Sequence, residues 1–297
     1  MTQLAPYGAA DGLVRVYPAS AAATDAAATR PTPGLVWAHG GGFVAGDLDM
    51  PEADWVARTF AARGVTVVSI DYRLAGESDG RYPAGSDDVL AAWSWTIDHA
   101  EELGLDPARV AIGGASAGAN LVTGAVLRLL GRAPAATGPT RPAGVFLAYP
   151  TLLAVQPAPG AELRAALDAN PTADRFGPDA VRGMYEQYLG GPVDGASLTA
   201  APGLAEPSDV VGFPPTLVVN GDVDELRVSG ELFAATLASA GVPVELTLEP
   251  GTEHGHLNRP HEPAASATVD RVAAWIDRGF EPAASDALAA SDLTTIT

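Results

Sequence analysis

Residues 109–130 read RVAIGGASAGANLVTGAVLRLL, and this stretch decides the fold. It begins with apolar residues typical of a buried strand, passes through GASAG at 114–118, and continues as a run typical of a helix packed with small residues. A Gly-x-Ser-x-Gly turn between a strand and a helix is the setting of a nucleophile elbow, whose glycines allow close packing around an exposed hydroxyl. The stretch therefore predicts Ser116 as a nucleophile, with a packing turn or an anion-binding turn as the alternative.

The composition is that of a globular protein with a sizeable core. Of the 297 residues, 47% are hydrophobic and 18% are charged. The chain has no cysteine, and all 17 basic residues are arginine, which excludes disulfides, thiolate nucleophiles, a P-loop lysine and lysine Schiff bases. A net charge of −19 argues against nucleic-acid and membrane-surface partners. We see neither a signal peptide nor a membrane-spanning stretch, and expect a cytoplasmic protein.

Strand and helix patterns alternate along most of the chain. Strands are expected at residues 13–18 (as an edge strand), 35–39, 65–72, 109–113, 144–149, 216–220 and 244–248. Helices are expected at residues 54–63, 86–103 (opening with a Ser/Asp cap), 117–130, 229–240 and 264–280. This alternation predicts an α/β fold with a mostly parallel central sheet covered by helices on both faces.

One long segment breaks this alternation. Residues 151–212 contain helical patterns at 161–169 and 178–189 and no convincing strand. We therefore expect a core built from residues 1–150 and 213–281, and a small helical cap inserted at 151–212. Residues 282–297 are rich in Ala, Ser and Asp and are expected to form a loose tail.

A serine nucleophile needs a base, and the base needs an acid to orient it. Three histidines follow Ser116 in the chain: His254, His256 and His261. His254 lies in the loop after the strand expected at 244–248, which is the right place for the base. The acid should follow the strand expected at 216–220, where both Asp222 and Asp224 stand, and spacing alone leaves the two open.

A glycine loop supplies the remaining part of such a site. Residues 39–43 read HGGGF, directly after the strand expected at 35–39. Glycines let backbone N–H groups approach a ligand without a Cβ in the way, so this loop is a candidate oxyanion hole. The alternative is a flexible glycine-rich turn.

These motifs together resemble the hormone-sensitive-lipase-like family of α/β-hydrolase esterases. The resemblance covers about residues 13–280. It is carried by HGGGF at 39–43, DYRLA at 71–75, YPAGSDDV at 82–89, DPARVAIGGASAGANL at 106–121, AYP at 148–150, FPPTLVVNGDVDELR at 213–227 and AGVPVELTLEPGTEHGH at 240–256. It implies the α/β-hydrolase fold with a helical cap, and a serine carboxylesterase that acts on short- to medium-chain esters without a metal or cofactor.

The resemblance also implies a role for individual residues. The family's acid begins an Asp-x-Leu-Arg motif, which Asp224 matches and Asp222 does not. The implied catalytic triad is Ser116, Asp224 and His254. The implied oxyanion hole is the backbone of Gly41, Gly42 and Ala117. The implied structural supports of the site are His39, Asp71 and Arg73.

The sequence departs from the family pattern in ways that concern the pocket. His256 stands where an aromatic residue is common, and Ala115 where Asp or Thr is common. Only 38 residues precede HGGGF, so we expect half of the usual cap to be missing and the pocket to be open. We expect Phe43, Phe176, Tyr185 and Tyr188 to line this pocket. The alternative is that they are ordinary packing residues of the cap.

Other functions share these features. The same triad could hydrolyse amides, carbamates, lactones or peptides. A non-catalytic ligand receptor on this fold is the alternative from another class, and the filled triad positions argue against it. A small-molecule ester is the expected partner, and a homodimer is possible.

Overall fold

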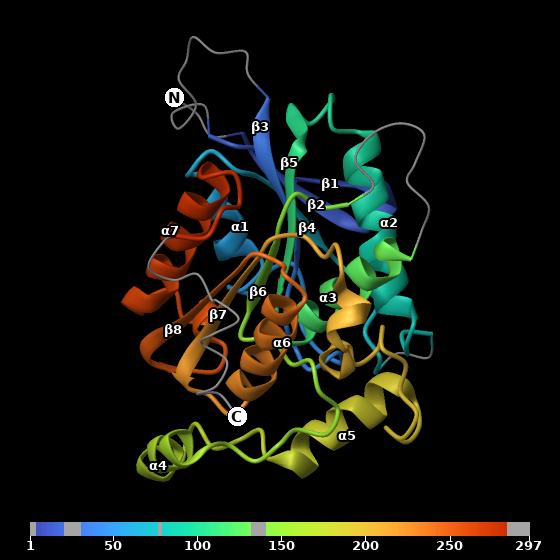
Figure 1. The fold of residues 1–297 in the computed structure, drawn as a ribbon. Coiled ribbons are helices and arrows are strands. Elements are labelled where there is room, and N and C mark those ends of the chain that lie inside the picture. The colour runs from blue at the N-terminus through green and yellow to red at the C-terminus, as the bar shows by residue number, and fades with distance from the viewer. Residues whose placement is uncertain (1–3, 21–30, 77–78, 132–140, 284–297) are drawn as a thin grey trace.

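The computed structural model describes residues 4–20, 31–76, 79–131 and 141–283. Within this part of the chain, eight strands form a single twisted sheet (Figure 1). The strands are β1 (Tyr7–Ala9), β2 (Val14–Tyr17), β3 (Thr32–Ala38), β4 (Thr66–Ile70), β5 (Leu105–Ala115), β6 (Val145–Ala148), β7 (Thr216–Val223) and β8 (Val244–Glu253). Their order is β1-β2-β4-β3-β5-β6-β7-β8, and all neighbours from β4 to β8 run parallel.

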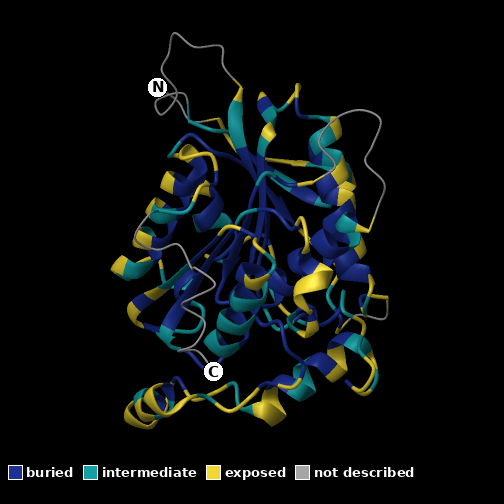
Figure 2. Cartoon of the chain, in the orientation of Figure 1, coloured by how far each residue is buried: buried dark blue, intermediate teal, exposed yellow. Residues whose placement is uncertain are grey.

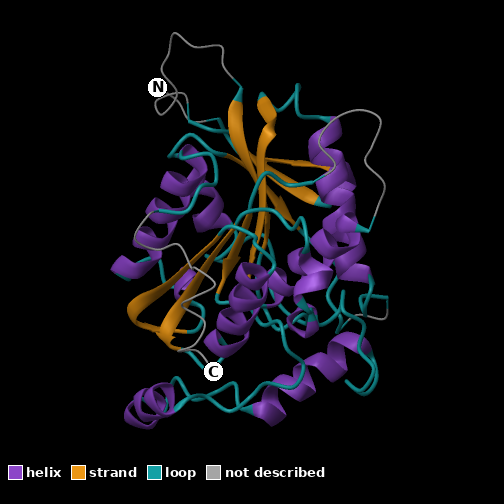
Figure 3. Cartoon of the chain, viewed as in Figure 1, coloured by secondary structure: helices purple, strands orange, loops and turns teal. Residues whose placement is uncertain are grey.

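Helices cover both faces of this sheet (Figure 3). The α-helices are α1 (Asp54–Ala61), α2 (Ala84–Asp98), α3 (Ala117–Leu130), α4 (Ala161–Ala169), α5 (Pro178–Leu189), α6 (Arg227–Ser239) and α7 (Pro263–Asp277). Short 3-10 helices are η1 (Ala10–Gly12), η2 (Pro202–Leu204), η3 (Pro207–Val210) and η4 (His256–Asn258). Helices α1 and α7 pack on one face, and α2, α3 and α6 pack on the other. The mostly parallel, two-sided sheet predicted from the sequence is confirmed.

The two faces of the sheet explain the continuous apolar runs of its strands. In β4, Val67 packs toward α1 and α7, whereas Val68 packs into the cluster that holds α2 and α3. A strand buried on both sides gains from an apolar residue at every position. Figure 2 shows the result, with the central strands buried and the exposed residues concentrated on the outer surfaces of the helices.

Two local predictions are wrong. Strand β2 is not at the edge of the sheet, because β1 pairs with it antiparallel and covers that edge. Helix α2 has no Ser/Asp cap: it begins at Ala84 without a side-chain capping hydrogen bond. Ser86 accepts from Arg128 at 2.9 Å instead, and Asp88 pairs with Arg73 at 2.8 Å. Tertiary partners thus take the side chains that the local pattern assigns to a cap.

Residues 151–212 contain α4 and α5 and no strand, as the sequence pattern indicates. Both helices lie beyond one end of the sheet, at the bottom of Figure 1. The buried face of α5 joins the apolar cluster of α2 and α3 through Val181, Tyr185 and Tyr188. That these residues form a separate cap remains a prediction, and the tail expected at 282–297 lies almost wholly outside the described residues.

The described residues before HGGGF, 4–20 and 31–38, form strands and one 3-10 turn and no α-helix. Whether the pocket is open for that reason stays a prediction. In the described part of the chain, every helix is too short or too polar to cross a membrane.

Candidate active site

Ser116 occupies a sharp turn between β5 and α3. Its backbone has φ 51° and ψ −116°, a strained combination for a residue with a side chain. The flanking glycines are required by packing: a Cβ on Gly118 would lie 2.2 Å from the carbonyl oxygen of His39, and one on Gly114 would lie 2.5 Å from the backbone of Gly118. The small residues around Ser116 therefore permit the close approach of β3, β5 and α3 that holds this turn.

Three side chains from separate loops meet at the carboxyl ends of the parallel strands. His254 follows β8 and Asp224 follows β7. His254 Nε2 lies 2.9 Å from Ser116 Oγ, and His254 Nδ1 lies 2.8 Å from Asp224 Oδ2. A carboxylate only accepts hydrogen bonds, so Nδ1 carries the proton and Nε2 of the neutral ring is free to accept from the serine hydroxyl.

Asp224 is held for this contact. Its side chain is fully buried, and its Oδ1 accepts the backbone N–H of Leu226 at 2.9 Å. Ser116 is 7% exposed, and the side chain of His254 is 10% exposed. In such a water-poor setting, the hydrogen bonds between charged and polar groups are stronger than at the surface.

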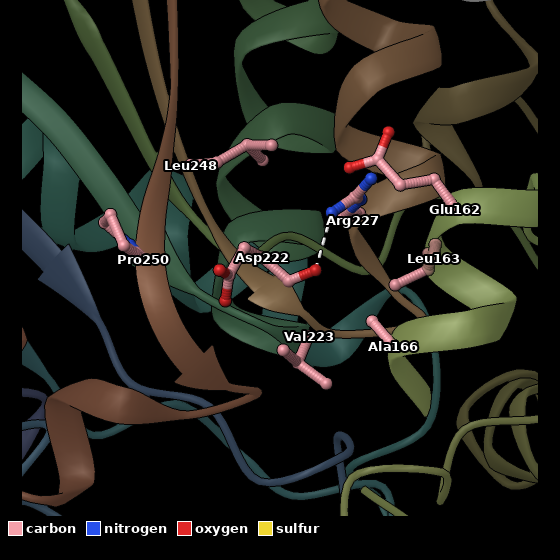
Figure 4. Close-up of a pocket in the computed structure, with 8 residues that line it drawn as sticks. All are labelled: Glu162, Leu163, Ala166, Asp222, Val223, Arg227, Leu248 and Pro250. Atoms are coloured by element: carbon pink, nitrogen blue, oxygen red, sulfur yellow. Dashed lines mark hydrogen bonds between the residues drawn. The ribbon is translucent and has the colours of Figure 1, made fainter. Parts of the chain in front are cut away.

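Asp222, the other acid left open by spacing, has a different place. Its carboxylate accepts the backbone N–H groups of Gly251 and Thr252 at 2.8 and 3.0 Å, and its carbonyl oxygen accepts from Arg227. Asp222 lines a separate pocket between α4, β8 and the start of α6 (Figure 4). Ser116, Asp224 and His254 do not line this pocket. Asp222 ties the end of β7 to the last residues of β8, and Asp224 alone of the two contacts His254.

The glycine loop lies against the nucleophile turn. A Cβ on Gly40 would lie 3.1 Å from Ser116 Cβ. Gly41 and Gly42 have φ of +124° and +59°, which favour glycine. Within the described residues, the N–H groups of Gly41, Gly42 and Ala117 donate to no protein acceptor. These three N–H groups are therefore available to a ligand oxygen beside Ser116.

The imidazole of His39 contacts this loop. Its Nδ1 lies 2.6 Å from the carbonyl oxygen of Gly40. Tyr72 stacks on the imidazole with ring centroids 4.5 Å apart, and its hydroxyl donates to the carbonyl oxygen of His39 at 2.8 Å. Tyr72 stands in the DYRLA motif but is not among the residues to which the resemblance assigns a role.

The neighbours of Tyr72 are tied elsewhere. Asp71 is exposed, and its backbone N–H donates to the carbonyl oxygen of Leu13, the residue before β2. Arg73 forms a bidentate pair with Asp88 of α2, so it supports the path of the chain between β4 and α2. Of this motif, only Tyr72 touches His39 directly.

The aromatic residues expected to line the pocket are packing residues in the structure. Phe43, Tyr185 and Tyr188 are each no more than 1% exposed. Phe43 stacks on Tyr188 with ring centroids 4.0 Å apart, and the Tyr185 hydroxyl donates to the carbonyl oxygen of Thr151 at 2.9 Å. They join α5 to the glycine loop and present almost no surface to a substrate.

Two partly buried side chains reach the site in their place. The Phe176 ring meets the His254 ring edge to face, with centroids 4.6 Å apart. Met184 packs against Gly42: a Cβ added to Gly42 would lie 3.3 Å from Met184 Sδ. The sequence holds a signal for Met184: Val181, Tyr185 and Tyr188 mark the buried face of α5, which leaves Met184 beside that face.

The second imidazole near the base is unfit for proton transfer. His256 is fully buried, and its Nε2 lies 2.8 Å from Thr268 Oγ1. Burial lowers the pKa of His256 to about 3, with smaller contributions from Arg259 and His254. His256 is therefore neutral at ordinary pH and acts as a packing residue beside Tyr149, whose ring meets it edge to face at 5.0 Å.

Comparisons with known proteins identify the fold and the family of the chain. A family model described as an α/β hydrolase fold matches residues 35–258. Carboxylesterase NlhH of Mycobacterium tuberculosis is 38% identical over 253 residues, which cover 84% of this chain and 74% of that protein. Ethyl acetate hydrolase of Pseudomonas putida is 32% identical over 228 residues, which cover 74% of this chain and 64% of that protein.

A solved structure extends the likeness to three dimensions. The thermostable carboxylesterase EstE1, cloned from a metagenomic library, superposes with a TM-score of 0.74 at 30% identity, over 94% of this chain and 88% of that one. The chain therefore belongs to the hormone-sensitive-lipase-like family of α/β-hydrolase carboxylesterases.

Proposed function

We propose that this carboxylic ester hydrolase cleaves short- to medium-chain acyl esters through an acyl-enzyme formed on Ser116. The observation that carries the proposal is the hydrogen-bonded series from Ser116 Oγ through the His254 ring to the Asp224 carboxylate, with spacings of 2.9 and 2.8 Å. A relative named for ethyl acetate supports short acyl esters as the substrate class.

In the first half of the reaction, His254 Nε2 takes the proton of Ser116 Oγ as the oxygen attacks the ester carbonyl. Asp224 holds the imidazole in the required tautomer and stabilises its positive form. The protonated ring then gives its proton to the departing alcohol oxygen, which leaves the acyl group on Ser116.

In the second half, His254 takes a proton from water, and the resulting hydroxide attacks the acyl-enzyme. The acid leaves and the proton returns to Ser116. The free N–H groups of Gly41, Gly42 and Ala117 are placed to stabilise the negative oxygen in both halves, and one such donor is typically worth about 10²–10³-fold in rate.

Residues 151–212 act as the cap in this proposal. They supply Phe176 beside His254 and Met184 beside Gly42, so the acyl or alcohol group of the ester meets both side chains. The cap thereby limits the size of ester that fits, whereas the core supplies the chemistry.

Hydrolysis of p-nitrophenyl acetate, butyrate and octanoate by the wild type and Ser116→Ala tests the proposal. We expect activity that falls with chain length, and a loss of about 10⁴-fold or more in the variant because the nucleophile is removed. Thermal unfolding of both proteins serves as the folding control.

Two results would contradict the proposal. An unchanged rate in Ser116→Ala would show that Ser116 is not the nucleophile. A folded wild type without activity on any of the three esters would redirect attention to amides, carbamates and lactones, or to a ligand-binding role.

A further inference from the structure

A buried carboxylate lies beneath the glycine loop and takes no part in the proposed chemistry. Glu52 is 2% exposed and stands just before α1. Its Oε2 accepts the backbone N–H of Gly40 at 2.6 Å, and its Oε1 accepts the Tyr149 hydroxyl at 2.5 Å and the Asn258 side-chain amide at 2.9 Å. Three neutral donors from three separate chain segments thus converge on one carboxylate.

The first of these bonds fixes the peptide between His39 and Gly40, which directly precedes the peptide that presents a proposed oxyanion donor, the Gly41 N–H. Glu52 holds the N–H of Gly40, while His39 at 2.6 Å and Tyr72 at 3.2 Å hold its carbonyl oxygen. In a trans peptide the carbonyl oxygen of one residue and the N–H of the next point in opposite directions. His39 and Tyr72 thus orient the peptide that carries the Gly41 N–H. Glu52 fixes the peptide before it, so the two peptides that flank the Gly40 Cα are both held.

The other two bonds join the glycine loop to the proposed base. Asn258 lies in η4, four residues after His254, and its side-chain oxygen accepts the backbone N–H of Glu52 at 3.2 Å. Tyr149 meets the His254 ring edge to face with centroids 5.0 Å apart. Glu52 is thus the common anchor of the segments that carry the oxyanion donor and the base.

The charge on Glu52 strengthens this anchor. Hydrogen bonds to an ionised acceptor are about twice as strong as neutral ones, and a buried donor left without its acceptor costs about 1–3 kcal/mol. Burial, with the charge of Glu52, raises the pKa of Tyr149 well above its ordinary value, so its hydroxyl remains a donor.

We propose that Glu52 is a positioning residue of the oxyanion hole, which holds the Gly41 N–H in the direction that the transition state requires and ties it to the loop of His254. This role rests on the proposed function. The Gly41 N–H meets full negative charge only in the transition state, so misplacing it lowers kcat and leaves KM nearly unchanged.

Glu52→Gln tests this role. Glutamine has nearly the same volume as glutamate. Its NH₂ group, however, cannot accept a hydrogen bond, so at least one of the donors that the carboxylate binds loses its acceptor. We expect kcat on p-nitrophenyl acetate to fall about 10–100-fold, which does not exceed the fall expected when one oxyanion donor is removed. KM should stay within about twofold of the wild-type value. The inhibition constant of an alkyl boronic acid, whose tetrahedral adduct on Ser116 resembles the transition state, should rise by the same factor as kcat/KM falls.

Glu245→Gln is the matched control. Glu245 is equally buried at 1% exposed, but it pairs with Arg278 at 3.0 Å and touches no residue of the site. We expect this variant to keep wild-type kcat and boronate affinity. A comparable fall of kcat in Glu52→Gln and Glu245→Gln would overturn the positioning role, because the fall would then be a general effect of losing a buried carboxylate.

The remaining outcomes are also decisive. A folded Glu52→Gln with wild-type kcat, or with a raised KM alone, overturns the role. If Glu52→Gln does not fold, Tyr149→Phe is the deciding variant, because it removes one hydrogen bond to Glu52 and keeps the aromatic ring. A several-fold lower kcat with unchanged KM in Tyr149→Phe supports the positioning role of Glu52. Wild-type values of kcat and KM overturn it.

Failure of this inference can be told apart from failure of the proposed function. Ser116→Ala is measured alongside each variant. If Ser116→Ala keeps the wild-type rate, the proposed function fails whatever Glu52→Gln does. If Ser116→Ala is inactive and Glu52→Gln is unaffected, only the positioning role of Glu52 fails.

Discussion

The ring of Phe176 packs edge to face on the imidazole of His254, with centroids 4.6 Å apart and planes inclined at 64°. The backbone N–H of Phe176 donates to the Glu225 carboxylate at 2.5 Å, and Glu225 is the neighbour of Asp224. Phe176, which packs on the proposed base, is therefore anchored to the loop that carries the proposed acid. Because Phe176 is only partly buried, part of its ring remains available to a substrate.

We predict that Phe176→Ala shifts the preference toward longer acyl chains. Removing the ring opens apolar space beside His254, and the ratio of kcat/KM for p-nitrophenyl octanoate to that for acetate should rise about tenfold. Phe176→Leu keeps much of the apolar volume and should shift the ratio less. Equal ratios in the wild type and both variants would show that Phe176 does not border the substrate.

The two acids after β7 give a matched pair of variants. Asp224→Asn should lower kcat on p-nitrophenyl acetate by about 10⁴-fold, because the amide favours the wrong tautomer of His254. Asp222→Asn should leave kcat near the wild-type value and lower the free energy of unfolding by about 1–2 kcal/mol, because the side chain loses charge-assisted bonds to Gly251 and Thr252. Kinetics and urea unfolding distinguish the two, and the reverse pattern would identify Asp222 as the acid.

His256 makes stability depend on pH. Its pKa is about 3 in the folded protein against an ordinary value of 6.5, with burial as the main cause. His256 therefore binds a proton more readily in the unfolded chain than in the folded protein. Its contribution to the free energy of unfolding is complete above pH 6.5 and is lost as pH falls toward 3. At pH 5 the loss is about 2 kcal/mol in the free energy of unfolding.

Urea unfolding at pH 7 and pH 5 measures this effect. His256→Phe should reduce the difference between the two pH values by about 2 kcal/mol, since phenylalanine does not titrate. His261→Asn is the control, because His261 is exposed and its removal should leave the difference in place. An unchanged difference in His256→Phe would mean that His256 does not control acid stability.

Much of the fold follows from local patterns. The spacing of apolar residues predicts α3, α4 and α5 with the bounds that the structure has, 117–130, 161–169 and 178–189. Apolar runs also locate every parallel strand from β3 to β8, although β3 begins earlier, β5 extends at both ends, and β7 and β8 end later than the runs indicate. These elements are buried on one or both sides, so their patterns are strong.

Side-chain partners were harder to predict. The Ser/Asp pattern at residues 86–88 predicts a cap, yet Arg128 binds Ser86 and Arg73 binds Asp88 from elsewhere in the chain. Glu52 carried no signal at all, because its donors Gly40, Tyr149 and Asn258 are scattered along the sequence. A local pattern reports hydrogen bonds between near neighbours only.

The sequence by itself determined the order of the strands β2 to β8 along the chain, the sharp turn around Ser116 and the glycine loop at 39–43, because each depends on residues that are adjacent in the chain. Spacing left Asp222 and Asp224 open, and the family resemblance favoured Asp224; the contact of Asp224 with His254, and the packing of Phe176 on the His254 ring, were decided by the tertiary structure. Those contacts join loops from different strands, and their distances depend on how the sheet brings strand ends together.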